Sequence, residues 1–78
     1  MTKEDDALEA AIIDQINAEL GAAGISMKQF AVMIGRPYDS TRNYLIKERR
    51  MSLGTFLEMS SALGLEISTI TSRARQRL

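Results

Sequence analysis

The sequence predicts an all-α fold: a compact bundle of five short helices forming one domain over residues 1–78. Apolar side chains recur at helical spacing over five stretches, and glycine or proline stands between most of these stretches. No stretch shows the strict alternation that a half-buried strand needs. With 45% apolar and 26% charged residues in a chain of 78, the composition is that of a folded domain with a small core.

The first predicted helix runs from about Glu4 to Leu20. Its apolar stripe consists of Leu8, Ile12, Ile16 and Leu20, widened by Ile13. Acidic residues crowd its first turns, where the helix dipole favours negative charge. We interpret this acidic cluster as a solvated helix start, with a site for a basic partner as the alternative. Gly21 and Gly24 are expected to end the helix.

The second helix is predicted over Met27 to Ile34. Ser26 and Gln29 have the spacing of a capping box, in which each side chain binds a backbone N–H at the helix start. Gly35 stands where the chain must turn sharply, a position that favours positive φ. The residues expected in the core are Phe30, Ala31 and Ile34.

The third helix is predicted from Tyr38 to about Ile46, because Pro37 fixes φ at its start. Thr41 and Tyr44 have the spacing of its inward face, and the small Ala31 allows this helix to cross closely over the second. Together the two helices and their turn form a helix-turn-helix pattern over about residues 26–46.

Two further helices are predicted after a basic loop. Ser52 is a plausible cap for a fourth helix from Leu53 to Leu63, which Gly64 ends. Its predicted apolar face consists of Leu53, Phe56, Leu57 and Leu63. The fifth helix is predicted from Ser68 to Arg77, with Ile67, Ile70, Ala74 and Leu78 as its apolar members. We interpret Arg73, Arg75 and Arg77 as a frayed basic C-terminus.

The outward positions of the third helix carry side chains that can hydrogen-bond a base edge or a phosphate. They are Tyr38, Asp39, Ser40, Arg42 and Asn43. Arg42 can pair with guanine, and Asn43 with adenine or phosphate. Asp39 is equally suited to cap the helix, and Tyr38 to cover the helix end. A solvated polar face is the alternative for the whole set.

Cations bracket this helix, with Lys28 before it and Lys47, Arg49 and Arg50 after it. Phosphate groups are the expected counterpart, and an ordinary solvated loop is the alternative. The net charge is zero, yet residues 1–25 carry one cation and six acids, a charge of −5, while residues 26–78 carry nine cations and four acids, a charge of +5. We therefore expect the acidic first helix to point away from a basic face.

The absence of cysteine and histidine excludes disulfides, thiol nucleophiles, imidazole catalysis and nearly all zinc sites. No glycine-rich phosphate loop is present either, so we expect no enzyme, cofactor, metal or small-molecule substrate. No apolar run approaches the roughly 18 residues of a membrane span, and the acidic start is the reverse of a signal peptide. We expect a cytoplasmic, nucleoid-associated protein that contacts no membrane.

Over about residues 25–72, the chain resembles the lambda-repressor-like, or Cro/C1-type, helix-turn-helix DNA-binding domains, in particular those of phages and actinobacteria. The resemblance lies in Ala31, Gly35, Pro37, Ser40, Thr41, Tyr44, Leu45, Arg49, Met51, Leu53 and residues 62–65. Four positions depart from the family's pattern: Met27 replaces a common Gln, Tyr38 replaces Gln, Arg or Ser, Thr41 replaces an aliphatic residue, and Lys47 replaces a frequent Gly.

The resemblance implies a sequence-specific transcription regulator of the phage immunity repressor or Cro kind, with the third helix in the major groove of double-stranded DNA. It implies a homodimer on a partly palindromic operator. The implied base contacts are Tyr38, Asp39, Ser40, Arg42 and Asn43, and the implied phosphate contacts are Lys28, Gln29, Lys47, Arg49 and Arg50. The fifth helix is the candidate dimer contact, through Ile67, Ile70 and Leu78.

Two alternatives remain open from the sequence. The chain is either a minimal regulator of the Cro kind or the DNA-binding part of a longer repressor, and an antitoxin has the same features. The competing interpretation is a small helical protein-protein interaction module, adaptor-like or antitoxin-like, that binds no DNA. The acidic first helix and the apolar residues of the fifth would serve such a module.

Overall fold

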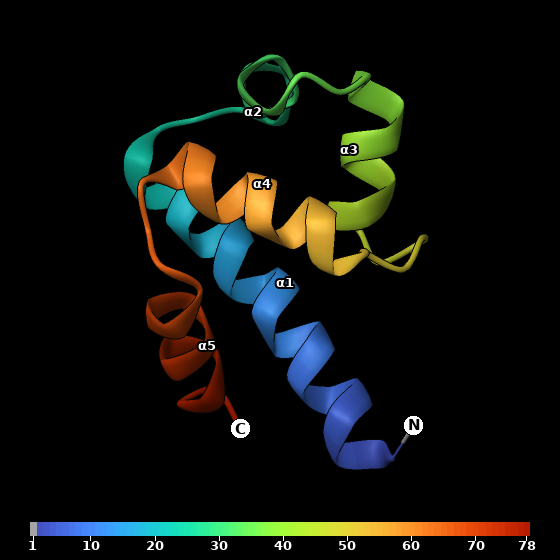
Figure 1. Ribbon diagram of the computed structural model, residues 1–78, viewed down its shortest axis with the longest axis vertical. Coiled ribbons are helices and arrows are strands. Elements are labelled where there is room, and N and C mark those ends of the chain that lie inside the picture. Colours follow the sequence, from blue (N-terminus) through green and yellow to red (C-terminus); the bar gives the residue numbers. More distant parts are fainter. Residues whose placement is uncertain (1) are drawn as a thin grey trace.

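Five α-helices form the regular structure of residues 2–78, the part of the chain that the computed structural model describes (Figure 1). They are α1 (Lys3–Ala23), α2 (Met27–Ile34), α3 (Tyr38–Leu45), α4 (Leu53–Leu63) and α5 (Ile67–Arg75). No strand occurs within these described residues, which measure 32 × 22 × 19 Å along their principal axes. The prediction of an all-α bundle of five helices is confirmed.

The first helix is longer than predicted at both ends. Thr2 caps its start, because the Asp5 N–H donates to the Thr2 hydroxyl at 3.2 Å and the Thr2 N–H donates to the Asp5 carboxylate at 3.4 Å. Gly21 lies inside the helix, and only Gly24 ends it, with φ of 68°. Figure 1 shows the N-terminal half of α1 extending beyond the rest of the bundle.

Three helices end in the same way, with glycine in the left-handed conformation. These residues are Gly24 after α1, Gly35 after α2 and Gly64 after α4. After α2, the Arg36 N–H then donates to the Ala31 carbonyl at 3.0 Å, which satisfies a backbone oxygen that the helix leaves unpaired. The stops at Gly35 and Gly64 agree with the prediction, whereas for α1 only Gly24, and not Gly21, ends the helix.

The third helix ends with the same backbone geometry, but without glycine. Lys47 has φ of 66°, and the following Glu48 N–H donates to the Asn43 carbonyl at 2.9 Å. A left-handed conformation costs a residue with a side chain about 1–2 kcal/mol. Lys47 is thus a strained lysine at a position that favours glycine.

The core draws on every helix. Its buried apolar cluster consists of Ile16 and Leu20 from α1, Phe30 from α2, Tyr44 and Leu45 from α3, Met59 from α4 and Ile70 from α5. Burial of Phe30, Ile16 and Tyr44 agrees with the sequence prediction, whereas Leu8 and Ile12 of the predicted α1 stripe are only partly buried.

The predicted apolar face of α4 is partly wrong. Leu53 and Leu57 are 69% and 47% exposed, and the residues that α4 buries are Thr55, Met59 and Ser60. Most turns of this helix carry apolar side chains on more than one side. The spacing of the apolar residues therefore did not predict which side of α4 faces the core. The Ser60 hydroxyl is satisfied locally, because it donates to the Phe56 carbonyl at 2.9 Å.

The fifth helix packs along α1 and buries Ile70 and Ala74 completely. The prediction that Ile70 contributes to a contact between two chains is therefore wrong, since its side chain is already enclosed within one chain. Ile67 is partly buried, and Leu78 is 68% exposed.

Two of the three arginines near the C-terminus are paired with α1, although α5 ends at Arg75 and not at the predicted Arg77. The Arg73 guanidinium forms an ion pair with the Glu19 carboxylate at 2.6 Å, and Arg77 Nε donates to Gln15 Oε1 at 2.8 Å. For these two side chains the interpretation as an unpaired, frayed end is wrong, because it ignored the acceptors that α1 offers; Arg75 is exposed.

The arrangement of α2 and α3 differs from that of the other helices. Figure 1 shows α2 end-on and α3 from the side, so their axes cross steeply across the short turn at residues 35–37. The pair lies at one end of the molecule, and α5 lies at the other. None of the helices in residues 2–78 is long and apolar enough to cross a membrane.

Candidate nucleic-acid interface

The turn between α2 and α3 is tied to α4. Arg36 Nε, in the turn, donates to Glu58 Oε2 at 2.9 Å, and this hydrogen bond raises the pKa of Arg36 above its ordinary value. Pro37 then occupies the N-cap position of α3, and the Thr41 hydroxyl donates back to the Pro37 carbonyl at 3.0 Å. These contacts fix the point at which α3 begins.

Asp39 does not cap α3. The N-cap position belongs to Pro37, and no side chain accepts a hydrogen bond there. Asp39 lies one residue into the helix with an exposed side chain, where its charge is favourable beside the positive end of the helix dipole. The capping alternative left open by the sequence is therefore excluded, and Asp39 stays available to a partner.

The inner face of α3 is held by burial and by one long-range hydrogen bond. Thr41, Tyr44 and Leu45 are all buried, so the predictions for Thr41 and Tyr44 are confirmed. Asn17 of α1 donates to the Leu45 carbonyl at 3.0 Å and to the Ile13 carbonyl at 3.1 Å. Sequence reasoning missed Asn17, whose only signal was a polar side chain next to the buried Ile16.

The outer face of α3 consists of Tyr38, Asp39, Ser40, Arg42 and Asn43. The side chains of Tyr38, Asp39 and Arg42 are exposed, and those of Ser40 and Asn43 are partly buried. Within residues 2–78, none of these five side chains makes a hydrogen bond or an ion pair. This outer face thus concentrates unused donors and acceptors on one short, well-supported helix.

The start of α2 carries two further side chains of the predicted interface, Lys28 and Gln29. Lys28 is exposed, and no carboxylate of the described chain pairs with it. Gln29 closes the predicted capping box: its Oε1 accepts from the Ser26 N–H at 2.8 Å, and its own N–H donates to Ser26 Oγ at 3.1 Å. In the part of the chain that the structure describes, its side-chain nitrogen has no acceptor, and it can donate to a partner. Met27 packs against the core.

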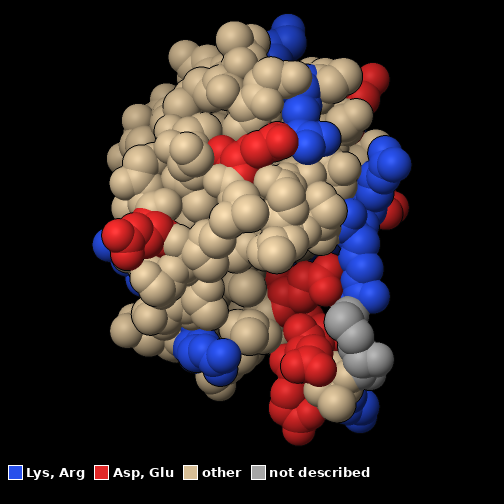
Figure 2. Space-filling view, in the orientation of Figure 1, with Lys and Arg blue, Asp and Glu red and all other residues tan. Residues whose placement is uncertain are grey.

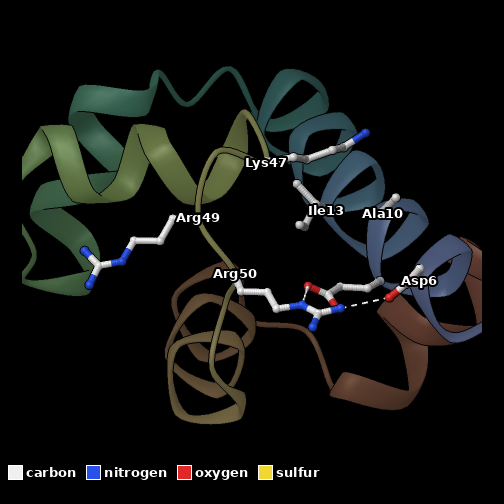
Figure 3. A pocket seen from close by; sticks show the side chains of 7 residues that line it. Asp6, Ala10, Ile13, Lys47, Arg49 and Arg50 are labelled. Atoms are coloured by element: carbon white, nitrogen blue, oxygen red, sulfur yellow. Dashed lines mark hydrogen bonds and ion pairs between the residues drawn. The ribbon is translucent and has the colours of Figure 1, made fainter. Parts of the chain in front are cut away.

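The basic loop, residues 46–52, is paired with α1. Lys47 Nζ lies 2.7 Å from Asp14 Oδ1, and Arg50 Nη2 lies 2.8 Å from Asp6 Oδ1 and 3.2 Å from Glu9 Oε2. Figure 3 shows the Arg50 guanidinium directed at the two carboxylates. The expectation that the acidic helix points away from the basic residues is wrong.

Arg49 differs from the other two loop cations. Its guanidinium lies 5.9 Å from the centre of the Tyr44 ring, within the range of a cation–π contact. Its side chain is exposed and points away from Asp6 and Arg50 in Figure 3. In the described chain no carboxylate pairs with it.

The charged groups therefore form neighbouring strips instead of opposite faces. Figure 2 shows acidic residues gathered over the N-terminal half of α1, with basic residues directly alongside. Residues of both strips line a hollow of about 300 Å³. It is lined by Asp6, Glu9, Ala10 and Ile13 from α1 and by Lys47, Arg49 and Arg50 from the loop. Local pairing of this kind was not visible in the sequence, where the two charge clusters are far apart.

Two other features bear on function. Three apolar side chains of α2 and α4 are exposed, namely Val32, Met33 and Leu57, of which Val32 is 81% exposed. Met33 and Leu57 line one hollow of about 420 Å³, and Val32 is not part of its lining. No group of three or more potential metal ligands occurs among residues 2–78.

Comparison of the chain with protein-family models, with curated proteins and with solved structures finds no match.

Proposed function

We propose that this chain is a sequence-specific transcription regulator that binds double-stranded DNA with α3 in the major groove. Among known classes it is best described as a phage immunity repressor or a Cro-like repressor. The observation that carries the proposal is the outer face of α3, where five polar side chains have no partner within the described chain. Such a face suits the donor and acceptor pattern of base edges.

The local architecture supports this proposal. In helix-turn-helix proteins the second helix of the pair enters the major groove while the first crosses the backbone. Here α2, the turn at residues 35–37 and α3 provide that order, and α3 presents its polar face outward. Lys47 also adopts positive φ, which accounts for the glycine that is frequent at this position in the family that the sequence resembles.

We assign the phosphate contacts to side chains that form no ion pair within the described chain. Lys28 and the Gln29 amide flank one end of the helix pair, and Arg49 flanks the other. These three positions can reach a phosphate without breaking an ion pair. Lys47 and Arg50 already face carboxylates on α1, which weaken their attraction for a phosphate.

A partly palindromic operator would be bound by a homodimer, with each copy reading one half-site. Of the residues expected at the dimer contact, Ile67 and Leu78 are at least partly accessible, while Ile70 is not. Regulation of this kind works by occupying a promoter and needs no covalent chemistry. Such a protein acts in the cytoplasm, on the nucleoid.

The test begins with selection of bound sequences from a random duplex pool at controlled salt, followed by affinity measurements on the enriched sequence. Arg42→Ala/Asn43→Ala should weaken binding by about 100-fold or more, since each lost bidentate contact is worth about 1–3 kcal/mol. Arg75→Ala/Gln76→Ala is a matched control on α5, because it removes the same charge and an amide from exposed positions. It should change the affinity less than about threefold.

The second candidate is a helical protein-interaction module, adaptor-like or antitoxin-like. The exposed Met33 and Leu57 favour it, because they line one hollow and exposed apolar patches often mark contacts with other proteins. The two candidates separate in the same experiment. No enriched sequence, together with unchanged DNA affinity in Arg42→Ala/Asn43→Ala, would favour the interaction module.

A further inference from the structure

Two of the three cations in the basic loop already have anionic partners. Arg50 contacts two carboxylates, those of Asp6 and Glu9, at 2.8 and 3.2 Å. Lys47 contacts Asp14 at 2.7 Å. All three acids come from α1, from positions more than 30 residues away in the sequence. The cations that the resemblance assigns to phosphate are therefore held by the protein's own carboxylates.

The charge balance at Arg50 is negative. One guanidinium faces two carboxylates, so the cluster carries a net charge of −1, and the Lys47 pair is neutral. A phosphate that approaches Arg50 meets two negative groups beside the guanidinium. Their repulsion reduces its net attraction to Arg50 until at least one carboxylate has moved away.

Displacement is feasible because these pairs are open to solvent. The side chains of Arg50 and Asp6 are 62% and 57% exposed, those of Lys47 and Asp14 are 42% and 48% exposed, and that of Glu9 is 32% exposed. Exposed pairs of this kind are weak and exchange readily with other ions. Figure 3 shows the Asp6 carboxylate beside the Arg50 guanidinium, so a second anion at this guanidinium lies close to that carboxylate.

We propose that Asp6, Glu9 and Asp14 of α1 act as internal competitors for phosphate, which hold the basic loop in a self-paired state and lower the affinity for duplex DNA. The inference rests on the proposed function and adds its regulation. A duplex docked on α3 draws Arg50 away from α1, and the freed carboxylates return to water. The affinity for duplex DNA is thereby limited, because Arg50 must exchange the carboxylates of α1 for a phosphate.

The test compares two doubly neutralised variants in binding to a mixed-sequence DNA duplex over a range of salt. Asp6→Asn/Glu9→Gln removes the competitors of Arg50. Glu4→Gln/Asp5→Asn is the matched control, since it makes the same charge change in the first turns of the same helix and spares the pairs with the loop. Asn at position 5 also keeps an oxygen for the capping box.

Asp6→Asn/Glu9→Gln should raise the affinity about tenfold near 0.1 M salt, and its plot of log affinity against log salt should steepen by about one unit, because one more phosphate is neutralised. The control should gain less than about threefold with an unchanged slope. Thermal unfolding of all variants establishes that they are folded under the conditions used.

Arg50→Ala completes the cycle. In the wild-type background it should lower the affinity less than about twofold, and in Asp6→Asn/Glu9→Gln it should abolish the gain. Equal gains in the two neutralised variants overturn the competitor role, and so does a loss of affinity in Asp6→Asn/Glu9→Gln, which would mean that the acids position the loop. Absence of duplex binding by the wild type at low salt overturns the proposed function as well.

Discussion

The outer face of α3 and the basic loop are adjacent in sequence and both carry arginine, yet their cations have different contacts within the folded chain. Arg42 has no partner within the described chain, whereas Lys47 and Arg50 are paired with carboxylates of α1. The difference comes from tertiary neighbours, because α1 runs past the loop and not past the outer face of α3. A cation's presence in the sequence therefore does not establish that it is available to a ligand.

The two regions also differ in what holds them. α3 is held by its own buried side chains, Thr41, Tyr44 and Leu45, and by the hydrogen bond that Asn17 donates to the Leu45 carbonyl at its end. The loop contains a strained lysine, and only Met51 among its residues is packed against the core. Its cations Lys47 and Arg50 are held by exposed ion pairs, each worth about 0–1 kcal/mol. We therefore expect substitutions at the buried positions of α3 to lower the stability of the fold. Substitutions of the loop cations should affect mainly the binding of a partner.

The largest expected effect is on the support of α3. Leu45→Ala should lower the free energy of unfolding by about 2–4 kcal/mol, because it leaves a cavity in the core. The neighbouring Ile46→Ala, at a side chain 38% exposed, is the control and should cost less than about 1 kcal/mol. Urea unfolding measures both. Similar losses at the two positions would contradict the placement of α3 on the core.

A smaller effect is expected from the strain at Lys47. Lys47→Gly and Lys47→Ala both remove the ion pair with Asp14, so they differ mainly in the cost of positive φ. The glycine variant should be about 1 kcal/mol more stable than the alanine variant in chemical denaturation. Equal stabilities, or a more stable alanine variant, would show that residue 47 is not held in the left-handed conformation.

The smallest effect is expected from the loop's ion pairs. Arg50→Ala should change the free energy of unfolding by less than about 1 kcal/mol, and the difference from wild type should shrink further in high salt. Unfolding curves at low and high salt measure it. A loss comparable to that of Leu45→Ala would mean that the loop is a structural element, and the contrast between the two regions would disappear.

Helix ends were predictable from the sequence because they depend on neighbouring residues. Ser26 with Gln29 and Ser52 each cap a helix as predicted. Gly35 and Gly64 end helices for an equally local reason, the ease with which glycine takes positive φ. The number, order and approximate bounds of the helices followed from these signals.

Packing between helices was not predictable in the same way. The inward side of α4 was misassigned because Leu53 and Leu57 are as apolar as the buried Met59, so hydrophobicity alone did not choose between them. The pairing of Asp6 with Arg50 depends on where α1 passes the loop, which no local pattern encodes. For the candidate interface, the sequence identified the exposed residues of α3 but not the pairing state of the loop cations.

The central claim, that α3 is the DNA-reading element, is tested most directly by mapping backbone amide shifts in the labelled protein as the selected duplex is added. We expect the largest amide shift changes in the turn at residues 35–37 and in α3, Tyr38–Leu45, and smaller changes at the start of α2 and in the basic loop. Changes confined to α5, or to the exposed face of α4, with α3 unaffected, would contradict it.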